Sequence, residues 1–332
     1  MDHLFQGAEM KIVFYFFAML FFTGMACAHK NEDASRSAID SSLLTIVDSI
    51  NDEHDDNDVA DAFIPSDYLL VIAISSEDGR RLLVVSETDE DDVFADIRPD
   101  AVTTCFYNGQ LYPVRYVGKQ KESDESTGRV TTQNFKNLGG YVYELISSKL
   151  PLEEDNDVYY VLLSDRKFAD DFSPVKMEEY VDQDDEGNIV YDDYATRRIE
   201  QTRGDLVKRY GRKIKTVEAV SATSDGEYFV YSVQFENKGT EALGLVALET
   251  PDGYSILEEP AEYDEISTWR VDDEGYYAAP HVVEFFRKYD GVRLILLERI
   301  GAEGSNFEFY ISHEDGKLKR YGRDWYFYFA PI

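Results

Sequence analysis

Near the middle of the chain, several side chains that carry oxygen atoms follow one another at close intervals: Asp182, Asp184, Glu186, Asn188 and Asp193. Calcium ions in proteins are held by several hard oxygen ligands on a tightly turned backbone. A glycine stands inside this stretch, where a sharp turn would be needed. The residue types and their spacing therefore make this acidic stretch the candidate calcium site of the chain.

The acidic stretch resembles the EF-hand calcium loop. Oxygen ligands fall at the first, third and fifth loop positions, Gly187 at the sixth and apolar Ile189 at the eighth. The stretch departs from that family at Asp193, where the EF-hand loop has a longer glutamate that binds through both oxygens. Val181 and Val190 flank the glycine as strand residues would. We predict a β-hairpin here and no cofactor, with a bound calcium ion as the alternative.

A second candidate is a group of cations in an otherwise acidic protein: Arg197, Arg198, Arg203, Arg209 and Arg212. Arginine presents a planar fork of donors that suits carboxylates and phosphates. The group could therefore bind an anion or a partner protein. In the simpler interpretation, which we favour, these arginines neutralise acidic side chains of the same chain.

Signatures of enzymes are largely missing from the sequence. The chain contains no G-x-S-x-G, H-E-x-x-H, P-loop or C-x-x-C pattern. His281 and Glu284 lie three residues apart and could share one face of a helix, but a metal site needs further ligands. We therefore predict a non-enzymatic binding or scaffold protein. The alternative is a secreted or anchored hydrolase that depends on a divalent cation.

The beginning of the chain has the pattern of an export signal. Lys11 precedes the apolar run 12–22, and small residues follow. Gly24-Met25-Ala26-Cys27 resembles the lipobox of bacterial lipoproteins, although that family usually has leucine where Gly24 stands. The resemblance implies palmitate and related acyl chains on Cys27 and a lipid anchor in the outer membrane or at the cell surface. Ordinary signal cleavage after Ala28 is the alternative, which would leave a periplasmic or secreted protein.

The formal net charge of −33 limits the partners of the protein. Such a charge repels the phosphate backbone of nucleic acids, so we predict no nucleic-acid partner. Beyond the membrane that holds the lipid anchor, a protein or a glycan is a possible partner. Flat sugar faces stack on aromatic rings and the chain is 14% aromatic, but we favour ordinary strand composition as the explanation of these aromatic residues. Cys105 is predicted to be a buried strand residue.

Changes in charge and in the pattern of apolar residues along the sequence indicate four segments. Residues 1–26 form the leader and 27–66 an acidic tether with one short helix at 35–50, while 67–194 and 195–332 are two β-rich domains.

The fold class that the sequence predicts is α+β, mainly antiparallel β, with hairpins, meanders and a few short helices. Turn dipeptides separate apolar runs throughout the last 270 residues or so. They stand at Asp78-Gly79, Asn108-Gly109, Asp225-Gly226, Asp252-Gly253, Asp290-Gly291 and Asp315-Gly316. Helical spacing of apolar residues predicts helices over 141–150 and 279–289, and a further helix over 194–207 that Gly211 would end.

Overall fold

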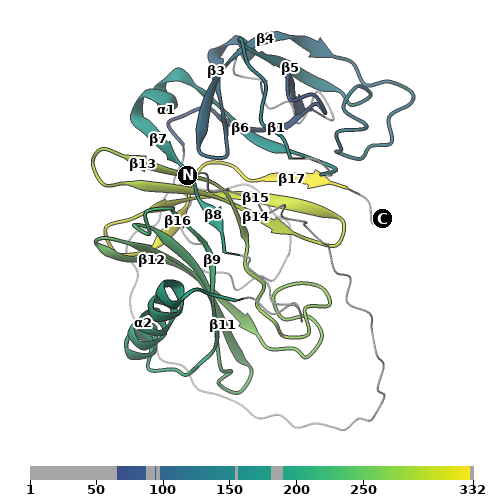
Figure 1. Ribbon diagram of the computed structural model, residues 1–332. Helices are drawn as coiled ribbons and strands as arrows, with labels where there is room; N and C mark the ends of the chain where they lie inside the picture. The colour runs from purple at the N-terminus through teal and green to yellow at the C-terminus, as the bar shows by residue number, and fades with distance from the viewer. Residues whose placement is uncertain (1–65, 87–93, 95–97, 154–155, 181–189, 330–332) are drawn as a thin grey trace, which may run out of the picture. The chain divides into compact units, whose positions relative to one another are not determined.

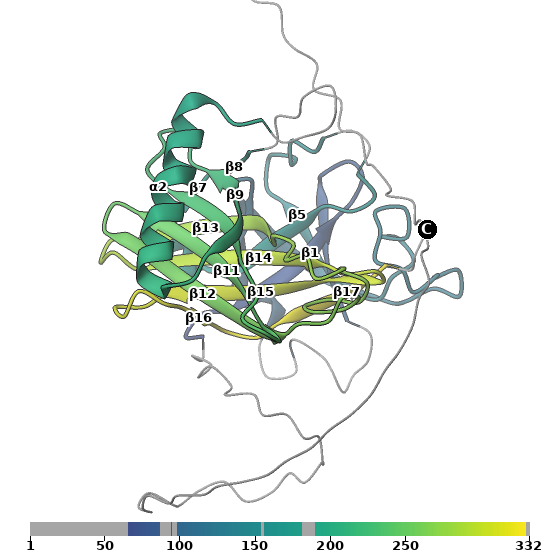
Figure 2. The same ribbon diagram turned by 90° about the horizontal axis from the view of Figure 1, so that it is seen from below.

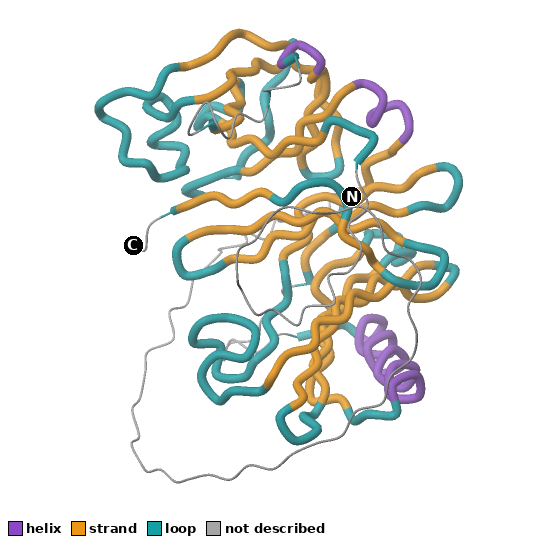
Figure 3. The backbone as a smooth tube through the Cα atoms, turned by 180° about the vertical axis from the view of Figure 1, so that it is seen from behind, coloured by secondary structure: helices purple, strands orange, loops and turns teal. Residues whose placement is uncertain are grey.

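The computed structural model describes residues 66–86, 94, 98–153, 156–180 and 190–329. Of the residues that the structure describes, 48% are in strands and 11% in helices, and the ladders between neighbouring strands are antiparallel. The predicted α+β, mainly antiparallel class is therefore confirmed. Figure 3 shows how strands dominate the fold. The candidate calcium residues 182–188 and the predicted tether helix lie outside the described residues.

The first part of the chain forms a closed six-stranded barrel in the order β1-β2-β5-β4-β3-β6, and β6 returns to pair with β1. Closure leaves the barrel without unpaired sheet edges. A 3₁₀ turn (Pro99–Ala101) precedes β3, and helix α1 (Arg166–Asp171) follows β6. The barrel strands are β1 (Leu70–Ser75), β2 (Arg81–Val85), β3 (Val102–Tyr107), β4 (Gln110–Gln120), β5 (Gly140–Leu145) and β6 (Tyr160–Asp165).

The rest of the chain forms two antiparallel sheets and the long helix α2 (Asp193–Tyr210). The sheet that carries α2, here called the helix-side sheet, contains β8 (Glu178–Glu179), β9 (Ile214–Ala222), β10 (Phe229–Phe235), β11 (Glu241–Thr250) and β12 (Gly253–Glu262). The other, here called the central sheet, contains β7 (Phe172–Val175), β13 (His281–Lys288), β14 (Arg293–Ile300), β15 (Gly304–Ser312), β16 (Leu318–Arg320) and β17 (Trp325–Tyr328).

Three apolar clusters join these parts in layers. Helix α2 packs on the outer face of the helix-side sheet through Ile199 and Leu206. The inner face of that sheet packs on the central sheet, and the opposite face of the central sheet packs on the barrel. Figures 1 and 2 show α2 and the helix-side sheet on one side of the central sheet and the barrel on the other.

The apolar run of β14 explains why the central sheet lies between two partners. Leu294 and Leu296 belong to the cluster that includes the barrel, whereas Ile295 and Leu297 belong to the cluster with the helix-side sheet. Successive side chains of a strand point to opposite faces. A strand that is apolar at every position therefore needs a covering layer on both sides.

The turns that the sequence predicts all join paired strands, as expected. In the β9–β10 turn, the Asp225 carboxylate accepts hydrogen bonds from Thr223 Oγ1 at 2.6 Å and from the Glu227 amide at 3.0 Å. Gly226 takes a φ of 67°, in the left-handed region that favours glycine. The aspartate thus stabilises the tight turn by hydrogen bonds, and the glycine allows its left-handed backbone conformation.

Helix α2 and Cys105 also match their predictions. Asp192 caps the start of α2 by accepting a hydrogen bond from the Ala195 amide at 2.6 Å, and Gly211 ends the helix with a φ of 57°. This left-handed glycine is the usual way to end a helix. Cys105 is fully buried in β3.

Two predicted helices are wrong. Residues 141–150 contribute the strand β5, and residues 279–289 contribute β13. In β5, Tyr141, Val142 and Tyr143 are all buried, since both faces of the strand are covered. Their continuous apolar run imitates a helical period when it is read without its neighbours. In β13, a register shift after Val282 breaks the alternation in the same way.

Strands β7 and β8 pair across the predicted boundary between residues 194 and 195. Phe172–Val175 pairs with β13 of the central sheet, and Glu178–Glu179 pairs with β9. The part of the chain before residue 195 therefore supplies edge strands to both sheets that follow it.

A charged cluster fastens the two sheets together. Arg299 of the central sheet contacts Glu259 of the helix-side sheet at 2.5 Å and Glu308 at 2.9 Å. The Tyr277 hydroxyl also donates to Glu259. Burial raises the pKa of Glu259, while Arg299 opposes that shift. The guanidinium is therefore the main positive charge that stabilises the ionised glutamate between the layers.

Replacement of Arg299 by leucine should lower the free energy of unfolding by about 3–5 kcal/mol, because it leaves buried carboxylates without their cation. Urea denaturation at pH 7 measures this loss. Arg115→Leu is the matched control, since Arg115 pairs with Glu144 on the barrel surface and its side chain is 68% exposed. The control should cost far less. Equal losses would show that the cluster does not stabilise the layered fold.

Candidate functional site

Four Asp-Gly turns lie at one end of the two sheets. They are Asp225-Gly226, Asp252-Gly253, Asp290-Gly291 and Asp315-Gly316, and together they are called the turn end here. In a meander, alternate hairpins come to the same end of the sheet. Contacts between the sheets join the two sets: Arg287 Nη1 lies 3.7 Å from Glu227, and the Ile256 amide donates to the Gly316 carbonyl at 3.0 Å.

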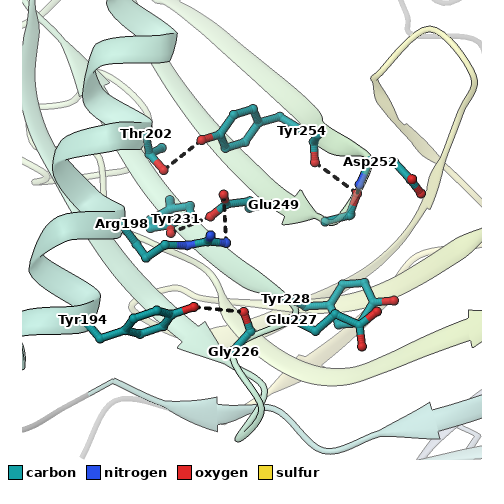
Figure 4. A network of polar contacts seen from close by, with 12 residues as sticks. Tyr194, Arg198, Thr202, Gly226, Glu227, Tyr228, Tyr231, Glu249, Asp252 and Tyr254 are labelled. Atoms are coloured by element: carbon teal, nitrogen blue, oxygen red, sulfur yellow. Dashed lines mark hydrogen bonds and ion pairs between the residues drawn. The ribbon is translucent and has the colours of Figure 1, made fainter.

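The turn end contains a cavity of about 460 Å³, here called the turn-end cavity. Helix α2 forms one wall, and the β9–β10 and β11–β12 turns form the others (Figure 4). The lining residues include three carboxylates and one arginine, namely Asp205, Glu227, Glu249 and Arg198. The formal charge of these four groups is therefore negative.

A network of polar contacts holds the inner part of the cavity in place. Arg198 Nη2 lies 2.9 Å from Glu249 Oε1, and the Tyr231 hydroxyl donates to Glu249 Oε2 at 2.8 Å. Both oxygens of this buried glutamate therefore have partners. Burial, followed by the negative charge of Glu249, raises the pKa of Tyr231, so the hydroxyl keeps its proton. Figure 4 shows these three side chains converging from α2, β10 and β11.

Aromatic rings and a second hydrogen bond complete this network. The Arg198 guanidinium lies 5.2 Å from the centre of the Phe229 ring and 5.9 Å from that of Tyr194. Thr202 and Tyr254 join α2 to β12 through hydroxyls 3.0 Å apart. Burial has the largest effect on the pKa of Arg198 and lowers it, but Glu249, Tyr231 and Tyr194 together outweigh burial, so the pKa is raised. The arginine stays charged, and its charge is already balanced inside the protein.

The groups on the rim of the cavity are more accessible. Gln201 and Asp205 lie on exposed positions of α2, and Glu227 is partly exposed. Glu227 also has Arg287 as a neighbour at 3.7 Å. The inner charges of Arg198 and Glu249 compensate one another. The carboxylates of Asp205 and Glu227 at the rim therefore make the cavity favour a positively charged ligand.

The structure distributes the five predicted arginines around α2 instead of gathering them. Arg198 alone among them lines the cavity. Arg203 lies 3.7 Å from Glu200, and Arg212 Nε donates to the Glu236 carbonyl at 2.7 Å. Arg197 is exposed, and the Arg209 guanidinium lies 5.8 Å from the centre of the Tyr210 ring. These contacts of Arg203 and Arg209 thus lie within α2, and that of Arg212 joins the segment after the helix to the end of β10.

Only one of the candidate metal residues lies in the described part of the chain. Asp193 is the first residue of α2, and its four predicted partners lie outside the described part of the chain. In that described part, no group of three or more His, Cys, Asp or Glu side chains is arranged to hold a metal ion.

His281 and Glu284 lie on a strand and make different contacts, so the helical face predicted for them is wrong. His281 Nδ1 lies 3.4 Å from Glu179 of β8, beside a small cavity of about 210 Å³. Glu284 is buried and accepts a hydrogen bond from the Gly109 amide of the barrel at 3.2 Å.

Sequence reasoning missed most of the turn-end cavity. Glu227, Glu249 and Tyr254 come from one turn and two strands, and each looks like an ordinary strand or turn residue. The recurrent Asp-Gly pairs were the available signal, because hairpins that alternate along a meander must share an end.

No protein-family model, curated protein or solved structure matches this chain. No helix in the described part has the length and apolar character needed to cross a membrane.

The buried Glu284 should make stability depend on pH. Burial raises its pKa from 4.5 to about 8, although the Gly109 amide acts in the opposite direction. Between these values the folded chain holds a proton that the unfolded chain has lost. The free energy of unfolding should therefore fall as pH rises from about 5 to about 8, by on the order of 3 kcal/mol.

Urea denaturation of wild type and Glu284→Gln across this pH range isolates the effect. The variant should have a flatter profile, because its amide does not titrate. Cys105, Tyr107 and Tyr112 also sense the charge of Glu284 and remain in both proteins. Glu77→Gln, an exposed change in the β1–β2 turn, serves as the control and should follow the wild type. Parallel profiles for wild type and Glu284→Gln would contradict the assignment.

Proposed function

We propose that this chain is a lipid-anchored binding protein of the bacterial cell envelope, and that the turn-end cavity receives a cationic group of its ligand. The observation that carries the second part is the charge of the cavity. Its arginine is paired internally with Glu249 at 2.9 Å, while Asp205 and Glu227 stand at the rim. The lipobox-like leader at Cys27 supports the anchor.

The charge of the whole chain supports the same ligand class. A formal net charge of −33 creates a field that draws cations towards the surface and speeds their encounter with it. That field alone would bind cations diffusely. The cavity adds a defined place, since its walls come from α2 and two turns that hydrogen bonds hold together.

Preorganisation is the second argument for binding at this place. Asp192 and Gly211 fix the two ends of α2, and the contacts of Arg198 and Thr202 fix its position on the sheet. A ligand that enters such a cavity does not have to order these side chains, so less of its binding energy is lost.

Removal of the two rim carboxylates should weaken the binding of a simple cation. With spermidine as the probe, isothermal titration calorimetry of the double variant Asp205→Asn/Glu227→Gln should show an affinity about fivefold lower, which corresponds to about 1 kcal/mol. The affinity of the wild type should fall as salt is added.

The matched control is Glu77→Gln/Asp170→Asn, which removes two exposed carboxylates from the barrel turn and α1. It changes the net charge by the same amount and leaves the cavity intact. An equal loss in both double variants would mean that spermidine responds to the overall field, and the cavity would then have no role of its own.

Lipidation makes a separate prediction. Cells that express the protein should incorporate labelled palmitate into it, and Cys27→Ser should abolish that labelling and release the protein from the membrane fraction. Cys105→Ser is the control, because Cys105 is buried in the barrel and should not affect the anchor. Unchanged labelling in Cys27→Ser, or a mature chain that starts at His29, would overturn the proposed anchor.

A further inference from the structure

At the end of the central sheet that lies away from the turn end, strand β17 exposes two tyrosines. Trp325 and Phe327 point into the cluster shared with the barrel. Tyr326 and Tyr328 alternate with them and therefore point to the opposite face, where they are 61% and 38% exposed. Two large side chains on one strand face, with Cα atoms about 7 Å apart, form a small aromatic surface.

The absence of a side chain at Gly304 makes room for the ring of Tyr326. A Cβ atom at this position would stand 2.6 Å from the Tyr326 hydroxyl oxygen and 2.7 Å from the ring carbon that carries it. The backbone carbonyl of Phe327 would be closer still. The missing side chain thus lets the outer end of the Tyr326 ring lie over the backbone of β15, with much of the ring still open to solvent. Gly304 does not have a positive φ, so a turn conformation does not explain this glycine.

Polar groups continue the same face beside the rings. Asn306 is paired with Tyr326 across the two strands and is partly exposed. Further along the edge, Arg320 forms an ion pair with Asp324 and lies 3.5 Å from Glu308. A guanidinium group donates hydrogen bonds, a carboxylate accepts them and a side-chain amide does both, so all three can bind hydroxyl groups. This row of Tyr326, Tyr328, Gly304 and Asn306 is called the tyrosine shelf here.

We infer that the tyrosine shelf is a binding surface for a neutral glycan. The carbon-bound hydrogens of a sugar ring would stack on Tyr326 and Tyr328, and its hydroxyls would bond to Asn306 and to the Arg320–Asp324 pair. The net charge of −33 disfavours an anionic ligand over any part of the surface. A purely apolar partner would leave the neighbouring ion pair without water or a hydrogen-bonding partner.

The shelf is separate from the turn-end cavity. Strand β15 runs from Gly304, beside the shelf, to Ser312, next to the turn end. At about 3.4 Å for each residue, this strand separates the two places by about 27 Å. The glycan inference therefore does not depend on the cation proposed for the cavity, and each can fail alone.

The test uses the whole purified chain with neutral hexasaccharides of glucose, of mannose and of N-acetylglucosamine as probes. Isothermal titration calorimetry should detect binding of at least one of them, with little change between low and high salt. Tyr326→Ala should weaken that binding at least tenfold. Tyr326→Phe keeps the ring face and should retain the affinity within about threefold.

The matched control is Tyr289→Ala, which removes a fully exposed tyrosine from the β13–β14 turn. It should bind the hexasaccharide as the wild type does. Circular dichroism and thermal denaturation check that each variant is folded, which the exposure of both tyrosines favours.

Several results would overturn the inference. They are the absence of binding for all three hexasaccharides at millimolar concentration, an equal loss in Tyr289→Ala, or a loss in Tyr326→Phe as large as that in Tyr326→Ala. A dimer in analytical ultracentrifugation that Tyr326→Ala dissociates would assign the shelf to a second copy of this chain instead. Spermidine binding should be unchanged in Tyr326→Ala, which keeps this test distinct from that of the cavity.

Discussion

The central sheet is apolar on both faces, and the other layers follow from this constraint. Leu294 and Leu296 must be covered on one side and Ile295 and Leu297 on the other, so the sheet needs the barrel and the helix-side sheet at once. The helix-side sheet in turn has a second apolar face, which α2 covers through Ile199 and Leu206. Each layer therefore creates the surface that requires the next one.

Polar groups at the joints between layers give these apolar contacts a defined register. Arg299 joins the two sheets through Glu259, and Glu284 joins the central sheet to the barrel turn at Gly109. A buried charge or carboxyl tolerates few arrangements, because a lost partner leaves it unsatisfied. Apolar surfaces alone could pack in several relative positions, whereas these polar contacts are satisfied in only one relative position of the layers.

Both proposed binding places follow from the ends of the meanders. One end collects the Asp-Gly turns and the start of α2, and its cavity is lined by carboxylates. Near the other end, β17 extends the central sheet and presents Tyr326 above Gly304. The rigid layers hold both places, so neither depends on the order of a long loop.

The sequence by itself determined the antiparallel class, the hairpins at the Asp-Gly pairs and the end of α2 at Gly211, because turns and caps depend on local backbone chemistry. It could not separate strand from helix at Tyr143 or Phe285, since a strand buried on both faces has no period of two. Nor could it bring Arg198, Tyr231 and Glu249 together, because their contacts depend on how α2 lies across the sheet. Only the tertiary structure decided these contacts, through the apolar faces that each layer must cover.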